Sequence, residues 1–213
     1  MSSANDDKSS LPLKSNYDGV ILLKTVKHHN FIAGDFSYGS NDFEKGILHH
    51  YDWSVDKLII GKFCQIGKNV KFFMNDCNHN YNYVSTFPFE LMKGFSDDNY
   101  QRDPKIYKGD IIIGNDVWIG DDVTIMPGIK IGDGVIIATN SHVVKDVPDY
   151  CVIGGNPAKV IKKRFDDEMV ELLKKLQWWN LPTEEINKIV KPILENSDIE
   201  FVKNEIKNFI KRN

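Results

Sequence analysis

Residues 113–148 repeat a unit of six residues: Ile113-Gly-Asn-Asp-Val-Trp118, Ile119-Gly-Asp-Asp-Val-Thr124, Ile125-Met-Pro-Gly-Ile-Lys130, Ile131-Gly-Asp-Gly-Val-Ile136, Ile137-Ala-Thr-Asn-Ser-His142 and Val143-Val-Lys-Asp-Val-Pro148. The first position of every unit is aliphatic, and the fifth is small or β-branched. The same register occurs upstream in units that begin at Ile60 and Ile66, with a weaker copy at Ile32. This period matches neither the spacing of an amphipathic helix nor the alternation of a single strand.

A period of six suits a solenoid of short strands joined by sharp turns. One aliphatic side chain per face then points to the axis, while Gly, Asn and Asp supply the turn conformations. A single rung cannot bury its own apolar side, so the rungs must stack. An ordinary antiparallel sheet would not hold one phase over 36 residues. The sequence therefore predicts a mainly β solenoid domain over residues 16–160.

Two regions outside the repeat have a different character. Residues 74–110 show no six-residue phase and contain several aromatic residues, which predicts an ordered loop inserted between rungs. Residues 1–15 are polar and are expected to be flexible.

The segment 161–213 is helical in composition. Asp166 is expected to cap a helix over residues 167–176, and a second helix is expected to start at Pro182. The capping-box spacing that begins at Ser197 predicts a third. Trp178 and its neighbour Trp179 are expected to fasten this C-terminal helical tail to the solenoid.

Composition limits the classes of function. The chain of 213 residues has a net charge of −3, and this balance does not predict binding to nucleic acid. Its polar start is unlike a signal peptide, and no apolar run is long enough to span a bilayer. The three cysteines form no paired motif, so neither a disulfide framework nor a zinc ribbon is expected. These features favour a cytoplasmic protein without a membrane partner.

Several motifs together resemble one family. They are Met74-Asn75-Asp76-Cys77-Asn78-His79, Ser85-Thr86-Phe87-Pro88-Phe89, Asp56-Lys57-Leu58-Ile59-Ile60-Gly61, Asn115-Asp116-Val117-Trp118-Ile119-Gly120, Met126-Pro127-Gly128, Gly154-Gly155-Asn156-Pro157-Ala158-Lys159 and Trp178-Trp179-Asn180. Over about residues 17–195 the chain resembles the xenobiotic acetyltransferases, most closely the streptogramin A (virginiamycin) enzymes and next the type B chloramphenicol acetyltransferases.

The resemblance implies both a fold and an activity. The fold would be a left-handed parallel β-helix in homotrimers, with one acetyl-CoA site in each cleft between subunits. The activity would be acetyl-CoA-dependent O-acetyl transfer to a hydroxyl of a xenobiotic, such as a streptogramin A antibiotic. No metal is expected.

His79 is the candidate general base. It lies where the repeat breaks, at the base of the insertion. Acetyl transfer to a hydroxyl requires removal of the acceptor proton, and a neutral imidazole suits this near pH 7. The flanking motif, through the resemblance, assigns the role to this histidine.

The resemblance also implies the remaining site residues by motif position. Trp118, which ends its unit and projects from the solenoid wall, would lie beside the reacting thioester. A groove for the pantetheine arm would be lined by Gly120, Ala138 and Thr139. The phosphates would be held by cationic side chains, those of Lys145, Lys159 and Lys162. The acceptor would contact Tyr38, Tyr51 and His49.

Alternative functions remain open at this point. The acceptor could instead be chloramphenicol, a sugar or another metabolite. A metal-binding hexapeptide-repeat trimer is disfavoured, because it needs converging imidazoles and no histidine lies between His79 and His142. His28 and His29 are expected to be solvated, and Cys64 to be a small core residue.

Overall fold

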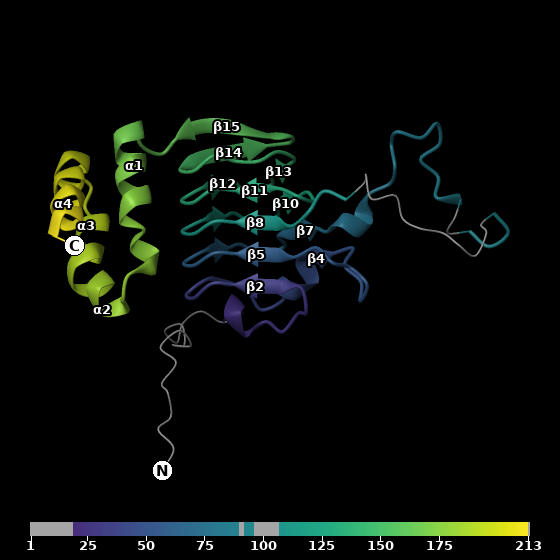
Figure 1. The fold of residues 1–213 in the computed structure, drawn as a ribbon, viewed down its shortest axis with the longest axis horizontal. Coiled ribbons are helices and arrows are strands. Elements are labelled where there is room, and N and C mark those ends of the chain that lie inside the picture. The colour runs from purple at the N-terminus through teal and green to yellow at the C-terminus, as the bar shows by residue number, and fades with distance from the viewer. Residues whose placement is uncertain (1–18, 90–91, 96–106, 213) are drawn as a thin grey trace, which may run out of the picture.

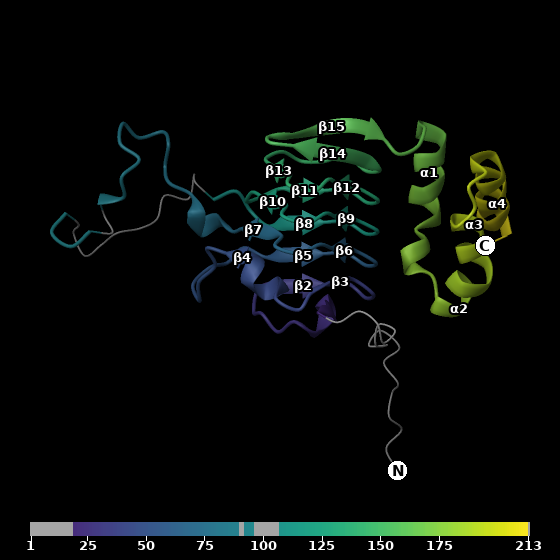
Figure 2. The same ribbon diagram turned by 180° about the vertical axis from the view of Figure 1, so that it is seen from behind.

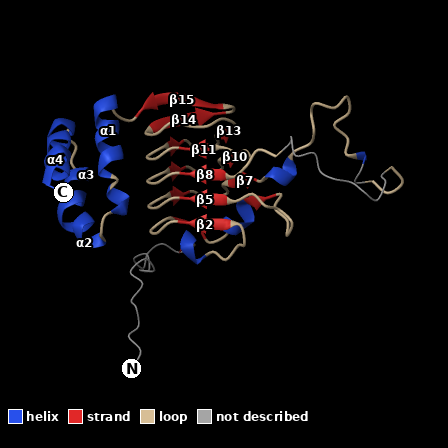
Figure 3. Cartoon of the chain, viewed as in Figure 1, coloured by secondary structure: helices blue, strands red, loops and turns tan. Residues whose placement is uncertain are grey.

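The computed structural model describes residues 19–89, 92–95 and 107–212, so the flexibility predicted for residues 1–15 lies outside the described residues. Its strands form three sheets (Figures 1 and 3). Sheet A contains β1 (Val20–Leu22), β3 (Tyr38–Ser40), β6 (Gln65–Ile66), β9 (Trp118–Ile119), β12 (Ile136–Ile137), β14 (Cys151–Gly155) and β15 (Ala158–Lys163). Sheet B contains β2 (Phe31–Ala33), β5 (Leu58–Ile60), β8 (Ile111–Ile113) and β11 (Lys130–Ile131). Sheet C contains β4 (Ile47–Leu48), β7 (Lys71–Phe73), β10 (Thr124–Ile125) and β13 (His142–Val143).

The chain winds repeatedly through the sheets in the order B, A, C. Neighbouring rungs pair in parallel and in register, so that Ile119 lies between Ile66 and Ile137. Antiparallel pairs lie at the two ends of sheet A, β1 on β3 and β15 on β14. The fold is the left-handed parallel β-helix that the resemblance implied, and this prediction is confirmed.

The axis is filled by the side chains that the repeat predicts to point inward. In the repeat of residues 113–148, every first and fifth position is buried: Ile113, Val117, Ile119, Val123, Ile125, Ile129, Ile131, Val135, Ile137, Ser141, Val143 and Val147. Cys64 is fully buried in the same column, as expected. Burial of one such aliphatic side chain stabilises the fold by about 1.5–3 kcal/mol.

Three corners join the sheets, and we name each by the sheets that it connects. The B–A corner comprises residues 34–37, 61–64, 114–117, 132–135 and 148–150. The A–C corner comprises residues 41–46, 67–70, 120–123 and 138–141. The C–B corner comprises residues 49–57, 126–129 and 144–146 and the two ends of the insertion, residues 74–89 and 107–110. These corners carry the turns and the insertion.

The corners explain why Asn and Asp recur in the repeat. Asp116, Asp122 and Asn140 have φ angles of 54°, 57° and 60°. Asn and Asp tolerate this left-handed conformation better than most residues with a side chain. The conformation of the turn therefore explains why the fourth position of these units is Asn or Asp.

The helical tail begins with α1 (Asp167–Leu176), for which Asp166 Oδ1 accepts a hydrogen bond from the Met169 backbone N at 2.9 Å. It continues through a 3₁₀ turn (Trp178–Asn180), α2 (Thr183–Glu185), a π-helical segment (Ile186–Val190), α3 (Lys191–Leu194) and α4 (Ile199–Arg212). The cap of α4 was predicted one residue early. Asp198 Oδ1, and not the Ser197 hydroxyl, accepts the hydrogen bond from the Phe201 backbone N at 3.1 Å.

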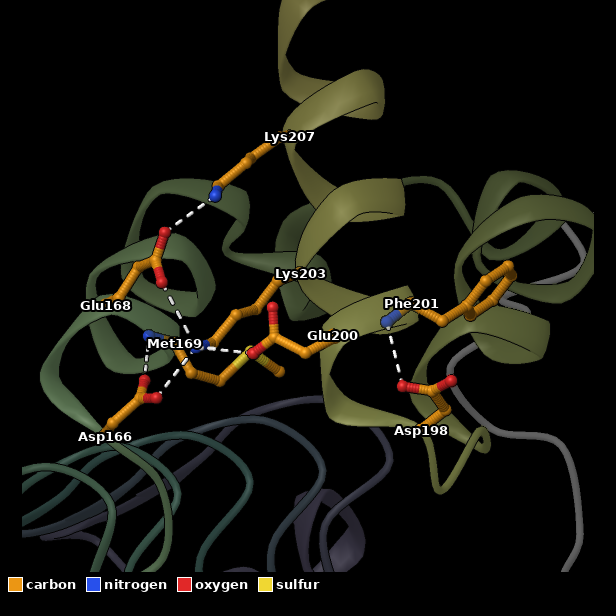
Figure 4. A network of polar contacts seen from close by, with 8 residues as sticks. All are labelled: Asp166, Glu168, Met169, Asp198, Glu200, Phe201, Lys203 and Lys207. Carbon is orange, nitrogen blue, oxygen red and sulfur yellow. Dashed lines mark hydrogen bonds and ion pairs between the residues drawn. The ribbon is translucent and has the colours of Figure 1, made fainter.

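A buried lysine holds the tail helices together (Figure 4). The Lys203 side chain is 5 % exposed, and its Nζ lies 2.7 Å from Asp166 Oδ2, 3.1 Å from Glu168 Oε2 and 3.2 Å from Glu200 Oε1. Asp166 therefore caps α1 and also anchors α4, because the Met169 backbone and Lys203 each bond to one of its carboxylate oxygens.

The tail packs on the B–A corner. The Trp178 and Phe63 rings lie 4.7 Å apart, and Lys62 Nζ donates to Asn180 Oδ1 at 3.1 Å. Arg164 pairs with Asp116 at 3.8 Å. Trp178 thus fastens the tail as predicted, while Trp179 is buried beside it.

The insertion leaves the β-helix on the side opposite the helical tail, as Figures 1 and 2 show. It leaves at the C–B corner after the end of β7 at Phe73 and returns before the start of β8 at Ile111. Short 3₁₀ turns flank the strands at Leu23–Thr25, Phe43–Gly46 and Asn75–Cys77. Within the described ranges, no helix is both long and apolar enough to cross a membrane.

Candidate functional site

His79 follows the 3₁₀ turn at the start of the insertion and is exposed. Its Nδ1 lies 3.1 Å from the carbonyl oxygen of Thr86. Because a carbonyl can only accept, Nδ1 carries the proton in this hydrogen bond. The same tautomer leaves the lone pair on Nε2. The side chain is therefore set up to accept a proton through Nε2.

A buried pair fixes the base of the insertion. Asp56 Oδ2 accepts hydrogen bonds from the backbone N and the Nδ2 of Asn75, both at 2.9 Å. Asn75 Nδ2 also donates to the Gly109 carbonyl at 2.8 Å, and Asn75 Oδ1 accepts from the Lys108 backbone N at 2.6 Å. One amide side chain thus ties the start of the insertion to its end. This clamp sets where the segment carrying His79 leaves the β-helix.

The sequence did not single out the roles of Asp56 and Asn75. Both lie in motifs that carry the resemblance, but neither residue type predicts a clamp. One signal was present in the sequence: Asn75 directly follows the apolar run 72–74, and Asp56 is separated from the apolar run 58–60 by Lys57 alone. Polar side chains that are buried there need partners.

The loop 49–57 lies against the base of the insertion. Ser54 Oγ donates to Asp76 Oδ2, and the Tyr51 backbone N donates to Ser54 Oγ at 2.9 Å. The Tyr51 ring stacks on the Trp53 ring at 4.8 Å and is 45 % exposed. The His49 ring lies 5.3 Å from the Phe73 ring. These contacts place Tyr51 and His49 on the C–B corner together with His79.

The second group of candidate residues lies on sheet A. Tyr38 pairs with Gln65, which pairs in turn with Trp118, so the three side chains share one register column. Trp118 is 53 % exposed on the outer face. The same column continues through Ile136 and Val152, and Val152 is paired with Lys162. Lys159 pairs with Gly154 on the same sheet.

Small residues stack where sheet A passes into the A–C corner. A Cβ on Gly120 would lie 2.7 Å from the Thr139 backbone N, so only glycine fits this position. A Cβ on Gly154 would lie 3.2 Å from the Cβ of Ala138. These small residues let successive turns stack closely, and Gly120 itself is buried beneath Thr139. Thr139 itself is exposed at the turn.

The candidate residues therefore fall on two different edges of one chain. Sheet A and the A–C corner carry Tyr38, Trp118, Gly120, Ala138, Thr139, Lys159 and Lys162. The C–B corner carries His49, Tyr51, His79 and Lys145. Lys145 is thus separated from the other two lysines predicted to hold phosphate, and Tyr38 from the other acceptor residues. A site that uses both sets needs two chains.

Neither of the cysteines nearest these residues resembles an activated nucleophile. Burial raises the pKa of the Cys64 thiol to about 11. Burial also raises the pKa of Cys77, which lies two residues before His79. Reactive thiols have lowered pKa values, so neither Cys64 nor Cys77 has the environment of a catalytic nucleophile.

Three histidines lie together on the chain. His29 is exposed, as expected, but His28 is partly buried, contrary to the expectation that it is solvated. The ring centroids of His28, His29 and His50 are each 4.9 Å apart. His28 is partly buried because it packs in the turn before β2, against the loop 49–57 that carries His50.

Comparison with known proteins gives a consistent set of relatives. The family model described as bacterial transferase hexapeptide (six repeats) matches residues 110–145. The chain is 45 % identical to a virginiamycin A acetyltransferase of Staphylococcus aureus, over 95 % of this chain and 94 % of that protein. It is 45 % identical to a chloramphenicol acetyltransferase of Morganella morganii, over 87 % and 91 % of the two chains. It is 48 % identical to a probable macrolide acetyltransferase of Lysinibacillus sphaericus, over 71 % and 85 %.

Proposed function

Since this chain belongs to the hexapeptide-repeat acetyltransferases, we propose that it transfers acetyl from acetyl-CoA to a hydroxyl of a xenobiotic, with His79 as general base. The observation that carries the proposal is the hydrogen bond between His79 Nδ1 and the Thr86 carbonyl. It holds the imidazole in the tautomer whose Nε2 can accept a proton.

The reaction then follows from this tautomer. Nε2 takes the proton of the acceptor hydroxyl as its oxygen attacks the thioester carbonyl carbon. The carbon–sulfur bond breaks as the tetrahedral intermediate collapses, and the imidazolium returns the proton to the departing thiolate. The Thr86 carbonyl, still bonded to Nδ1–H, stabilises the transient positive charge on the ring.

Acetyl-CoA would lie along the A–C corner of sheet A. The small side chain of Ala138 would let the pantetheine arm approach the backbone beside the exposed Thr139, and Gly120 would contribute by letting this turn stack closely on its neighbour. Trp118 would face the thioester, and Lys159 and Lys162 would bind phosphate oxygens.

The functional unit would be a homotrimer. Sheet A of one subunit would face the C–B corner of its neighbour, which supplies His79, His49, Tyr51 and Lys145. Such an arrangement unites the two sets of residues that a single chain keeps apart, and Tyr38 would meet the acceptor from the sheet A side.

We propose a streptogramin A antibiotic as the acceptor. The virginiamycin A relative matches almost the whole chain, and exposed aromatic rings such as Tyr51 suit a large amphipathic macrocycle. Chloramphenicol is the second candidate, because several relatives of comparable identity are named for it.

An acceptor screen with acetyl-CoA tests both parts of the proposal. Thiol release is followed with virginiamycin M-type compounds, chloramphenicol and simple sugars, using the wild type, His79→Ala and the control His142→Ala. We expect turnover of the preferred acceptor to fall roughly a hundredfold or more in His79→Ala and to stay unchanged in the control. Near-wild-type turnover in His79→Ala would exclude the general base, and turnover of sugars alone would exclude the drug acceptor.

A further inference from the structure

The cluster of His28, His29 and His50 has the form of a ligand set. Each ring offers one nitrogen such that the three atoms lie within 4.8 Å of one another. His28 and His29 precede β2, and His50 belongs to the loop after β4. The adjacent His49 has a φ of 57° and contacts Phe73, while His50 contacts His28 and His29. The side chains of the two neighbouring histidines therefore point in different directions, that of His49 toward Phe73 and that of His50 toward the cluster.

Two nitrogens of the cluster have no partner inside the described part of the chain. These are the Nδ1 atoms of His28 and His50, both buried. The Nε2 of His50, in contrast, lies 3.3 Å from the Asp56 carbonyl oxygen and 3.0 Å from Asn30 Nδ2. A buried nitrogen without a partner is unfavourable, and two of them beside a third imidazole need a common explanation.

We propose that His28, His29 and His50 bind one divalent transition-metal ion, with Zn²⁺ as the best match, within a single chain. Three imidazoles are a frequent protein ligand set for Zn²⁺, which leaves the fourth position to water. This site lies outside the acetyl-transfer machinery proposed above.

The geometry requires only a small adjustment. Zn–N bonds of about 2.0–2.1 Å at tetrahedral angles hold the ligand nitrogens about 3.4 Å apart. The three nitrogens now lie within 4.8 Å of one another, so each pair must approach by about 1.5 Å at most. The exposed His29 ring can supply most of this movement. A metal on His50 Nδ1 would place the ring proton on Nε2. This nitrogen would then donate to the Asp56 carbonyl, now 3.3 Å away, and would give up the hydrogen bond that it accepts from Asn30 Nδ2 at 3.0 Å. Backbone carbonyls commonly hold metal-binding histidines in this way.

Electrostatics also suit a cation at this position. The carboxylate of Glu44 interacts electrostatically with the His28 ring, so a negative charge lies close enough to favour a bound cation.

The bound ion would brace the loop 49–57. This loop carries Tyr51, which we place at the acceptor, and Asp56, which fixes the insertion. The ion would therefore stabilise the framework of the site without touching the reacting atoms.

Metal binding by tag-free protein tests the proposal directly. The protein is loaded with Zn²⁺ or Co²⁺, dialysed, and assayed for metal content and for the visible spectrum of Co²⁺. We expect one ion per chain, a four-coordinate Co²⁺ spectrum, and a melting temperature that rises with Zn²⁺. His29→Ala and His50→Gln should each weaken binding at least tenfold.

His142→Ala and His49→Ala are the matched controls, because neither histidine belongs to the cluster, and both should bind as the wild type does. His29 is exposed, so His29→Ala should keep the wild-type fold, and its melting temperature without metal checks this. A wild-type protein that retains no stoichiometric metal would overturn the proposal. Equal binding by the wild type and both cluster variants would overturn it as well.

Discussion

Asp56 and Asn75 are joined by two hydrogen bonds of 2.9 Å, although neither is exposed to solvent by more than 2 %. The amide of Asn75 also reaches Gly109 and Lys108, at the far end of the insertion. The Asp56 carboxylate therefore orients the Asn75 side chain, and this side chain joins the start of the insertion to its end. The position of His79 depends on this closure.

The first prediction concerns Asn75→Ala. The substitution leaves the Asp56 carboxylate with one hydrogen bond fewer and frees both ends of the insertion. We expect a loss of about 1–3 kcal/mol in the free energy of unfolding and a fall in kcat of roughly tenfold, because His79 is no longer held in place. The KM for acetyl-CoA should not change, since its proposed site lies on sheet A. Denaturant unfolding and steady-state kinetics measure these effects.

Asn187→Ala, an exposed change in the helical tail, is the control for Asn75→Ala. A variant of Asn75 that kept its wild-type kcat would show that the clamp does not position the base.

The sequence predicted those features of the fold that repeat. The first and fifth positions are buried on every rung from Ile113 to Val147, and burial at a fixed period leaves a pattern that can be read without coordinates. The N-cap at Asp166 was equally readable, because its partner, the Met169 backbone, is only three residues away.

The features that the sequence did not predict depend on distant partners. Asp56 and Asn75 are 19 residues apart, and Asn75 and Gly109 are 34 apart. His28 and His50 meet because the C–B corner returns the chain to the turn before β2. Contacts between residues so far apart produce neither a periodic pattern nor a local motif in the sequence. The N-cap of α4 was predicted at the wrong residue for a different reason. Ser197 and Asp198 are both good capping residues, and the backbone conformation determines which of them accepts the hydrogen bond.

The second prediction concerns the pH dependence of stability at Asp116. Burial raises the pKa of this carboxyl to about 6, although Arg164 acts to lower it. The folded state thus binds the proton more tightly than the unfolded chain, whose Asp pKa is about 3.9. The ionised group therefore destabilises the fold fully above pH 6, and this effect disappears as the pH falls below about 4.

Asp116→Asn should remove this destabilisation. Asn tolerates the left-handed φ of 54° at this position. We expect the variant to be more stable than the wild type by about 1–2 kcal/mol at pH 8 and equally stable near pH 4. Thermal and denaturant unfolding at the two pH values measure the difference. If the difference were the same at both, ionisation of Asp116 would not be its cause.

The third prediction concerns Tyr51. Its ring is exposed and contacts Trp53, so Tyr51→Ala should change the free energy of unfolding by no more than about 0.5 kcal/mol. Loss of aromatic surface should raise the KM for the acceptor several-fold and leave that for acetyl-CoA unchanged. Kinetics with each substrate varied separately, beside a thermal melt, test this. Equal effects on both substrates in a destabilised protein would instead make Tyr51 a structural residue of the solenoid.

The last prediction concerns the division of the site between chains. His79 lies on the C–B corner and Trp118 on sheet A, so the proposed trimer would take each from a different subunit. His79→Ala and Trp118→Ala should each be weakly active alone. When the two are unfolded, mixed in equal amounts and refolded, every mixed trimer has one interface where both residues are intact. Random assembly in a closed three-fold ring predicts recovery of about a quarter of wild-type activity. The control mixes His79→Ala with Tyr51→Ala, both on the C–B corner, and should show no activity beyond the mean of its two components. Failure of the first mixture to exceed its components would exclude a site that takes His79 and Trp118 from different subunits, because one intact interface per mixed trimer would then have restored activity.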